Sequence, residues 1–172
     1  MTIVKEYPAL ETERTILRIL TKDDAKEVLN HFSDPVVTMF MDIEPCKDLK
    51  EAEEIIQYHE DDLGCRWGIF DKCHGNFLGT IGFHNFRKID EEFIAEIGFD
   101  LSTRYWGKGY MTEVIEEVIQ FGFTRMGLDT IDATVGPNNE KSNNIMTKFE
   151  FKRDAELREQ LLYYSIHRVD YT

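Results

Sequence analysis

The chain has 172 residues, 42% of them hydrophobic and 12% aromatic, which excludes a disordered composition and supplies the material for one core. A chain of this length buries roughly 70% of the surface that its unfolded form exposes, and no repeat or linker divides it, so we expect a single domain over residues 1–172. Its 20 basic and 33 acidic side chains leave a net charge of −13, which opposes binding to nucleic acid or to anionic membranes.

The cysteines and the apolar segments indicate the compartment. The three cysteines are an odd number, and the N-terminal residues lack the apolar run of a signal peptide. No apolar stretch approaches the roughly 20 residues that span a bilayer. We therefore expect a cytoplasmic protein. No metal centre is expected, because Cys65, Cys73 and His74 lack the paired spacing of a structural zinc site.

The first predicted elements are a strand and two helices. Residues 15–20 suit a strand, and the helix that follows has apolar side chains three and four positions apart, at Ala25, Val28, Leu29 and Phe32. Pro35 should end this helix. A second helix begins after Asp48, where a capping signature recurs, and stops near Gly64. Its buried positions are expected at Ala52, Ile55, Ile56 and His59.

Three β-rich runs then predict an antiparallel meander. They cover residues 66–70, 77–86 and 93–100. Turn residues occupy 71–76 and the surroundings of Asp90. Connections this short join antiparallel neighbours.

The second half of the chain begins with its clearest helix, over residues 109–126. The glutamates of this segment face away from an apolar face formed by Met111, Val114, Ile115, Val118, Ile119 and Gly122. The later elements are a strand over 130–135, a helix capped by Asn138 or Asn139, and strands near 151–157 and 161–166. The sequence therefore predicts an α+β domain around a central sheet.

A glycine-rich segment, Arg104-Tyr105-Trp106-Gly107-Lys108-Gly109-Tyr110, lies between the third β-rich run and the long helix. Glycine tolerates positive φ, so that consecutive amides can turn toward an anion, and it lacks the Cβ that would hold a phosphate away. The helix dipole and the charges of Arg104 and Lys108 add attraction. The spacing matches neither a P-loop nor a dinucleotide-binding fingerprint. The segment therefore predicts a pyrophosphate site of another kind.

This segment resembles the acyl-CoA pyrophosphate loop of the GCN5-related N-acetyltransferases, the GNAT family. Residues 105–113 are similar to the branch typified by the ribosomal-protein N-acetyltransferases. Further similarity spans nearly the whole chain, in the segments 12–20, 78–83, 95–99, 139–142 and 148–151. Glu150 departs from the pattern, because the family usually places Gly there and a left-handed C-cap would strain a glutamate.

The resemblance implies one α+β domain with a central mixed, mostly antiparallel, twisted sheet of about six to seven strands, about four flanking helices, and a splay between the fourth and fifth strands. It implies that an amine attacks acetyl-CoA directly, without an acyl-enzyme and without a metal. The acceptor that fits the branch best is a protein N-terminal α-amine. The alternatives are a small cationic amine, such as a polyamine or an aminoglycoside, and a non-catalytic CoA-binding module. We expect a monomer or a homodimer.

The reaction needs a proton acceptor, because an alkylamine with a pKa near 10.4 is mostly protonated at neutral pH. By resemblance, Glu96 lies beside the thioester, and we expect burial to raise the pKa of its carboxyl toward the working range; a solvent-facing Glu96 and transfer through water are the alternatives. A backbone N–H near Gly98 or Phe99 would stabilise the oxyanion. Ser142 would protonate the leaving thiolate or serve only as a contact, and Asn139 would contact the cofactor or cap its helix.

The remaining site residues follow from the same resemblance. Those expected to bind acetyl-CoA are Phe99, Leu101, Arg104, Trp106, Gly107, Lys108, Gly109, Tyr110, Met111, Thr112, Asn139 and Ser142. The acceptor is expected at the segment 39–44 and at the strand end Phe83-His84-Asn85, with contacts from Phe40, Asp42, Glu44, Phe83 and Asn85. Carboxylates beside apolar side chains suit a cationic amine on an apolar stem.

Overall fold

A single sheet of eight strands forms the centre of the protein in the computed structural model, which describes residues 7–61 and 65–171. The spatial order of its strands is β1-β2-β3-β4-β5-β6-β8-β7. The strands are β1 (Leu10–Glu11), β2 (Thr15–Ile19), β3 (Cys65–Asp71), β4 (Phe77–Ile89), β5 (Glu92–Leu101), β6 (Thr130–Val135), β7 (Lys152–Arg153) and β8 (Leu162–His167). The α-helices in these ranges are α1 (Ala25–Phe32), α2 (Pro35–Thr38), α3 (Leu49–Asp61), α4 (Tyr110–Thr124) and α5 (Glu140–Lys148).

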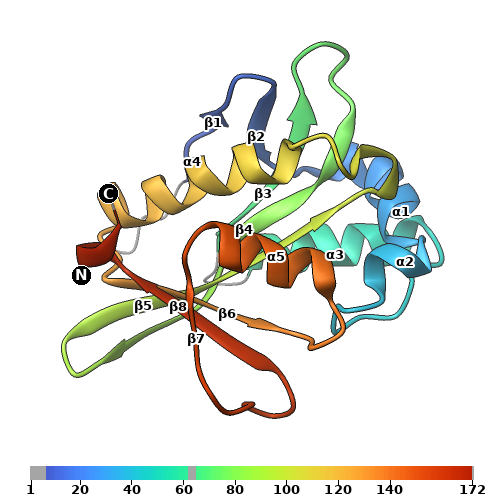
Figure 1. Ribbon diagram of the computed structural model, residues 1–172. Coiled ribbons are helices and arrows are strands. Elements are labelled where there is room, and N and C mark those ends of the chain that lie inside the picture. The colour runs from blue at the N-terminus through green and yellow to red at the C-terminus, as the bar shows by residue number, and fades with distance from the viewer. Residues whose placement is uncertain (1–6, 62–64, 172) are drawn as a thin grey trace.

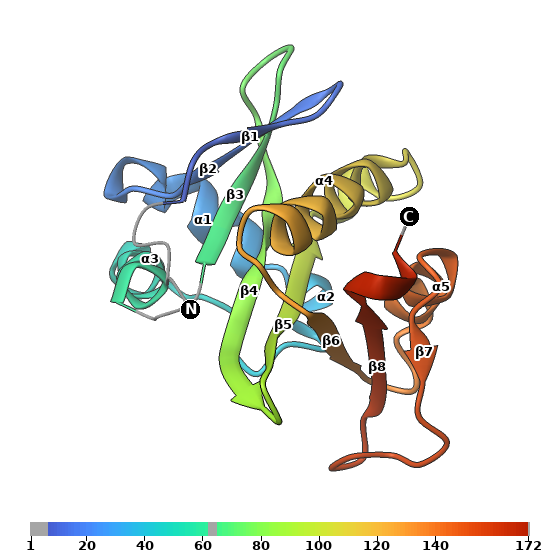
Figure 2. The same cartoon turned by 90° about the vertical axis from the view of Figure 1, so that its left-hand side faces the viewer.

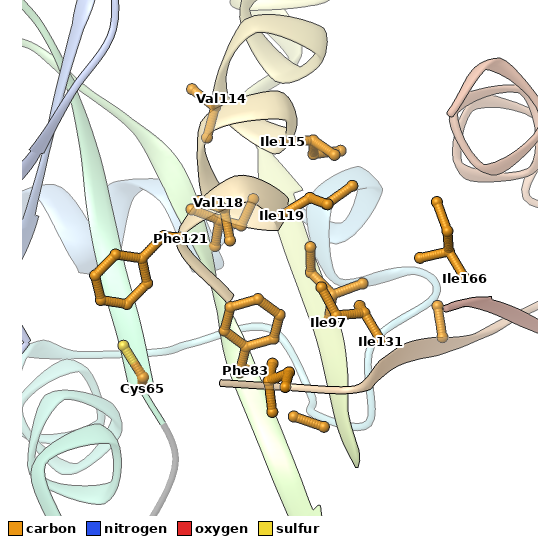
Figure 3. Close-up of a cluster of buried hydrophobic side chains, with 14 of the residues drawn as sticks. Cys65, Phe83, Ile97, Val114, Ile115, Val118, Ile119, Phe121, Ile131 and Ile166 are labelled. Carbon is orange, nitrogen blue, oxygen red and sulfur yellow. The ribbon is translucent and has the colours of Figure 1, made fainter. Parts of the chain in front are cut away.

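The longer helices lie on both faces of the sheet (Figure 1, Figure 2). α1 and α3 cover one face, and α4 and α5 lie on the other. The larger hydrophobic cluster fills the space between α4 and the sheet, where Val118 and Ile119 lie above Phe83 and Ile97 (Figure 3). A smaller cluster joins α1 and α3 to the opposite face. Among the helices of residues 7–61 and 65–171, none is long and apolar enough to cross a membrane.

One parallel pair interrupts the otherwise antiparallel sheet. β5 and β6 are parallel because α4 carries the chain back between them. Their register holds only for Ile94↔Thr130, Ala95↔Ile131 and Glu96↔Asp132. Beyond Glu96, β5 continues to Leu101 paired with β4, and no strand of residues 7–61 and 65–171 pairs with its other side. The predicted mixed sheet and the predicted splay are therefore confirmed.

A buried carboxylate fixes α1 to the sheet. The side chain of Asp100 is 4% exposed and accepts hydrogen bonds from His31 Nε2 (2.6 Å), Arg66 Nη2 (2.9 Å) and the Thr80 hydroxyl (2.6 Å). Burial raises the pKa of this carboxyl, but the hydrogen bond from His31 and the nearby Arg66 guanidinium outweigh burial and hold the pKa well below its ordinary value. These contacts join α1, β3, β4 and β5 at one point.

Most predicted elements are confirmed, and the differences lie at their ends. The predicted strands 15–20, 66–70, 93–100 and 130–135 are β2, β3, β5 and β6, and the predicted helix 109–126 is α4. α1 ends before Pro35 as predicted, but Pro35 also begins α2, because Asp34 accepts a hydrogen bond from Val36 N and caps this extra turn. The predicted end of the second helix near Gly64 lies outside the described residues.

The strand predictions differ from the structure at β1, β4 and β7. The strand expected over 151–157 is only the two-residue β7, because residues 155–160 are exposed and turn at Glu159 and Gln160, where φ is 51° and 68°. β4 runs on to Ile89 through a bulge, beyond the predicted end at residue 86. The two-residue β1 has no alternation that would reveal it. The sheet therefore has eight strands rather than six to seven.

Glu150 adopts the left-handed conformation that the resemblance implies. Its φ is 62°, and it follows Phe149, the C-cap of α5. Glu150 N donates to Thr147 O and Phe151 N donates to Met146 O, both at 3.0 Å, which together form a Schellman motif. The conformation costs a residue with a Cβ about 1–2 kcal/mol, and the burial of Phe151 and Met146 beside it offsets this cost.

Replacing Asp100 with alanine should lower the free energy of unfolding at pH 7 by about 3–5 kcal/mol, because the change leaves Arg66 largely buried without its carboxylate. Urea denaturation measures this loss. Asp154→Ala is the control, since the Asp154–Arg158 pair is exposed and such pairs contribute about 0–1 kcal/mol. Equal losses in the two variants would contradict the role of Asp100 as a buried anchor.

The stability difference between the wild type and Asp100→Ala should depend on pH. A carboxyl whose pKa is depressed by folding stabilises the protein above its unfolded pKa of about 3.9 and loses that contribution as the pH falls further. The stability difference between the wild type and Asp100→Ala should therefore stay constant near neutrality and shrink below about pH 4.

Candidate functional site

The glycine-rich loop leads directly into α4. Gly109 is the N-cap of α4 with a φ of 79°, and Gly107 has a φ of 73°. A Cβ at Gly107 would meet no atom within 4 Å, so the space beside this backbone is open. The first turn of α4 leaves backbone N–H groups without intrahelical partners next to that space. The loop therefore has the backbone form of an anion site.

Arg14, from the turn before β2, brings a further cation to this loop. Its guanidinium carbon lies 4.1 Å from the centre of the Tyr110 ring, and its Nη2 lies 3.5 Å from where a Cβ at Gly109 would stand. Glu113 holds it there by accepting from Arg14 N and Nε, both at 2.9 Å, and from the Thr12 hydroxyl. Desolvation raises the pKa of Glu113, but these hydrogen bonds outweigh it and lower the pKa. The carboxylate at this helix start is thus ionised and paired.

The predicted cofactor residues differ in whether their backbone or their side chain can reach a ligand. Trp106 Nε1 donates to Leu101 O at 2.9 Å and ties the loop to the end of β5, while Lys141 Nζ lies 4.4 Å from the centre of the Trp106 ring. Met111 is 7% exposed and its side chain belongs to the core, so only its backbone can reach a ligand. Phe99 also packs against that core and contributes the unpaired edge of β5. Exposed or half-exposed side chains remain at Arg104, Lys108, Tyr110 and Thr112.

A hydrogen-bonded carboxylate borders the gap between β5 and β6. Glu96 Oε2 lies 2.9 Å from His84 Nε2 and 3.4 Å from the Thr134 hydroxyl. Burial raises the pKa of Glu96, but the hydrogen bond and the charge interaction with His84 outweigh it, so the pKa lies below its ordinary value. This finding corrects the expectation of a raised pKa. Glu96 is an ionised partner of a histidine whose side chain is 40% exposed.

His84 and Glu96 lie on the face of the sheet opposite to α4, because side chains alternate along a strand. Their neighbours Phe83 and Ile97 lie in the core beneath α4 (Figure 3). The side chain of Phe83 is 1% exposed and that of His84 is 40% exposed, so of the two only His84 presents a side chain to the surface. Asn85 is exposed, with a φ of 53° inside the β4 bulge.

The segment 39–44 meets the sheet where β6 ends. Phe40 is 50% exposed, and its ring carbon Cδ1 lies 3.4 Å from where a Cβ at Gly136 would stand. The predicted acceptor residues Asp42 and Glu44 are exposed in the same segment. Phe40 thus lies close to the gap, while the two carboxylates make no hydrogen bond or ion pair with the described residues that would bring them to it.

The start of α5 closes the other side of the gap. Asn139 is the N-cap, with its Oδ1 accepting from Ser142 N at 3.3 Å. Asn143 Oδ1 accepts from the Tyr164 hydroxyl at 2.7 Å, and its Nδ2 donates to Gly136 O at 3.2 Å. These bonds fix the loop after β6 against β8. Asn139 is therefore a helix cap, and Ser142 is half-buried in the first turn that this cap supports.

Comparisons with known proteins agree with this arrangement. A family model of the acetyltransferase (GNAT) domain matches residues 14–152. The N-acetyltransferase YoaA of Bacillus subtilis (strain 168) is 35% identical over 159 residues, which cover 90% of this chain and 89% of YoaA. The crystal structure of a GNAT-family acetyltransferase from Bacillus anthracis matches with a TM-score of 0.82 and 22% identity, over 95% of this chain and 100% of that one. RimL, the ribosomal L7/L12 α-N-protein acetyltransferase in complex with coenzyme A, matches with a TM-score of 0.77 and 16% identity, over 93% and 98%.

The chain belongs to the GNAT family. It is an acetyltransferase. The family resemblance that the sequence analysis drew from the glycine-rich loop is confirmed. The roles of individual residues in this GNAT domain stay predictions. In the ranges that the structure describes, no cluster of His, Cys, Asp and Glu side chains is placed to hold a metal ion.

Gly107→Glu should abolish stabilisation by acetyl-CoA, because the added carboxylate would enter the open space beside the loop and repel a phosphate. A ligand at 100 times its Kd adds about 2.7 kcal/mol to the free energy of unfolding, which thermal unfolding detects as a rise in Tm. Gly127→Glu is the matched control: Gly127 has a φ of 75° and open surroundings but follows the other end of α4. A wild-type response in Gly107→Glu would exclude this loop as the cofactor site.

Arg14→Met should weaken the binding of acetyl-CoA about threefold to tenfold, the size expected for a partly exposed contact with a phosphate. Isothermal titration calorimetry at low and high salt measures it, and salt should reduce the difference. Lys72→Met is the control, because Lys72 N donates to Arg14 O but its Nζ pairs with Glu11 at 3.0 Å. Equal affinities in wild type and Arg14→Met at low salt would remove Arg14 from the site.

Proposed function

We propose that this GNAT domain transfers the acetyl group of acetyl-CoA directly to the α-amine of a protein N-terminus. The observation that carries the proposal is the position of the His84–Glu96 pair at the β5–β6 gap, with the glycine-rich loop at the far end of β5. The similarity to RimL, an α-N-protein acetyltransferase that was solved with coenzyme A, supports a protein acceptor.

The loop and its surroundings fit the anionic part of the cosubstrate. Gly107 and Gly109 leave the backbone accessible, and the cations around them are Arg14, Arg104, Lys108 and Lys141. Phosphate oxygens suit such a combination of backbone N–H groups and guanidinium or ammonium groups. The unpaired edge of β5 then offers hydrogen-bonding groups along the way from the loop toward Glu96.

In the proposed reaction the amine nitrogen bonds to the thioester carbonyl carbon, the C–S bond breaks, and coenzyme A leaves as a thiolate. The proton of the amine passes to His84 Nδ1, directly or through water, while Glu96 accepts a hydrogen bond from Nε2 and stabilises the imidazolium that forms. The low pKa of Glu96 suits this role, because a carboxyl with a low pKa is a weak base but stays ionised and can orient the histidine.

Two further groups complete the proposed chemistry. A backbone N–H near Gly98 or Phe99, on the unpaired edge of β5, would stabilise the oxyanion. The thiolate of coenzyme A has a pKa near that of cysteine, about 8.5, so it leaves without much help from an acid. We accordingly assign Ser142 a contact with the cosubstrate rather than the role of an essential proton donor.

Glu96→Gln should lower kcat for a peptide with a free N-terminal alanine by about 10²-fold at pH 7, because a neutral amide orients and stabilises the imidazolium poorly. Thiol release from acetyl-CoA measures the rate, with the N-terminally acetylated peptide as the blank. The deficit should narrow above about pH 8, where an α-amine is already neutral.

Thr134→Val is the matched control, since it removes only the weaker 3.4 Å contact of Glu96. It should change kcat little. If Glu96→Gln turns over as fast as the wild type at pH 7, solvent alone accepts the proton and the assigned role is wrong.

A further inference from the structure

Arg66 on β3 is a cation that the proposed chemistry does not use, although it lies on the same face of the sheet as His84 and Glu96. Its Nε donates to the Thr80 hydroxyl and its Nη2 donates to Asp100 Oδ2, both at 2.9 Å. Its third nitrogen, Nη1, makes no hydrogen bond within the part of the chain that the structure describes. The side chain keeps 19% of its surface exposed.

Nη1 lies beside the proposed catalytic pair, over the backbone of Gly98. A Cβ at Gly98 would lie 3.3 Å from Arg66 Nη1, 3.1 Å from His84 Cε1 and 3.6 Å from His84 Nδ1. Because Gly98 has no side chain, nothing of its own separates the guanidinium from the imidazole. Gly82 is the register partner of both Arg66 and Gly98, and it leaves the sheet surface between them free of a side chain as well.

The guanidinium is held in one orientation. Asp100 fixes Nη2 and is itself held by His31, and Thr80 fixes Nε. A planar guanidinium with two of its nitrogens fixed has its third nitrogen fixed too. Nη1 is thus a preset hydrogen-bond donor beside His84.

The charges around Nη1 are paired. Arg66 pairs with Asp100, and Glu96 is bonded to His84. Nη1 therefore offers a hydrogen bond rather than an unpaired charge. Because His84 Nδ1 lies close to it, one acceptor with an oxygen next to its amine reaches both groups.

We propose that Arg66 is a specificity residue whose Nη1 donates a hydrogen bond to an acyl oxygen beside the reacting amine, so that the acceptor is an α-amino acyl compound. That oxygen is the carbonyl of a peptide N-terminus or the carboxylate of a free amino acid. The amine then faces His84 and the oxygen faces Arg66, above Gly98. The inference rests on the proposed function and deepens it by naming the acceptor class, which polyamines do not fit because they have no acyl oxygen.

The test compares kcat/KM for L-alaninamide with that for isopropylamine, which has the same carbon skeleton without the acyl oxygen. The ratio of kcat/KM for L-alaninamide to kcat/KM for isopropylamine is measured in the wild type and in Arg66→Met. Comparing this ratio between the two proteins cancels the different basicities of the amines. We expect Arg66→Met to lower the ratio by at least about tenfold through the alaninamide rate alone. L-alanine and spermidine complete the panel. A faster rate with L-alanine than with L-alaninamide assigns the oxygen to a free amino acid, and the reverse assigns it to a peptide.

Two further variants keep the test decisive. Arg18→Met is the matched control, because Arg18 lies on the same sheet face, pairs with Asp24 at 2.8 Å and stacks on Phe70 rather than on the groups around Gly98. It should leave the ratio unchanged. Arg66→Lys keeps a cation near Asp100 but lacks the third nitrogen, and it should lower the ratio even if Arg66→Met fails to fold.

The outcomes separate this inference from the proposed function. If the ratio is the same in the wild type, Arg66→Lys and Arg66→Met, or if spermidine reacts as well as L-alaninamide, Arg66 has only a structural role and the inference is wrong while the transferase stands. If the wild type releases no thiol from acetyl-CoA with any of these acceptors, both proposals are overturned.

Discussion

The short parallel pairing of β5 with β6 is the constraint on which the rest of the structure depends. Parallel neighbours need a crossover, and α4 supplies it, so the start of α4 lies just past the end of β5. The register ends at Glu96 and Asp132, which leaves the last part of β5 with an unpaired edge. This one connection brings together the loop before α4, the unpaired edge of β5 and the groups around Glu96.

The sequence could predict what local patterns encode. The helical periodicity of α4, the glycines before it and the alternation in β5 are all visible within a few residues, and the structure confirms those elements. Arg14, His31 and Arg66 were missed, because their partners lie 99, 69 and 34 residues away and no local pattern links them. The pKa of Glu96 was misjudged for the same reason: burial was foreseeable, but the cross-strand hydrogen bond from His84 was not.

Charge is distributed against the overall balance of the chain. The net charge of −13 describes the whole surface, yet cations gather at the glycine-rich loop. Carboxylates beside the loop and at the β5–β6 gap are paired, Glu113 with Arg14 and Glu96 with His84, so they shape the positions of their partners more than the local potential. A net charge is therefore a poor guide to the ligand at a site, whereas the nitrogens and oxygens left without partners are a direct one.

The strand order has a consequence for how the chain reaches its native state. From β1 to β5, neighbours in space are neighbours in sequence, so most of the sheet needs only contacts between adjacent segments. The pairing of β5 with β6 instead closes a longer loop that contains the whole of α4. The largest entropy cost of loop closure therefore falls on this pairing. A cosubstrate lying along this seam would bridge two halves of the chain that assemble separately. Binding of the cosubstrate and completion of the fold would then both depend on the junction between β5 and β6.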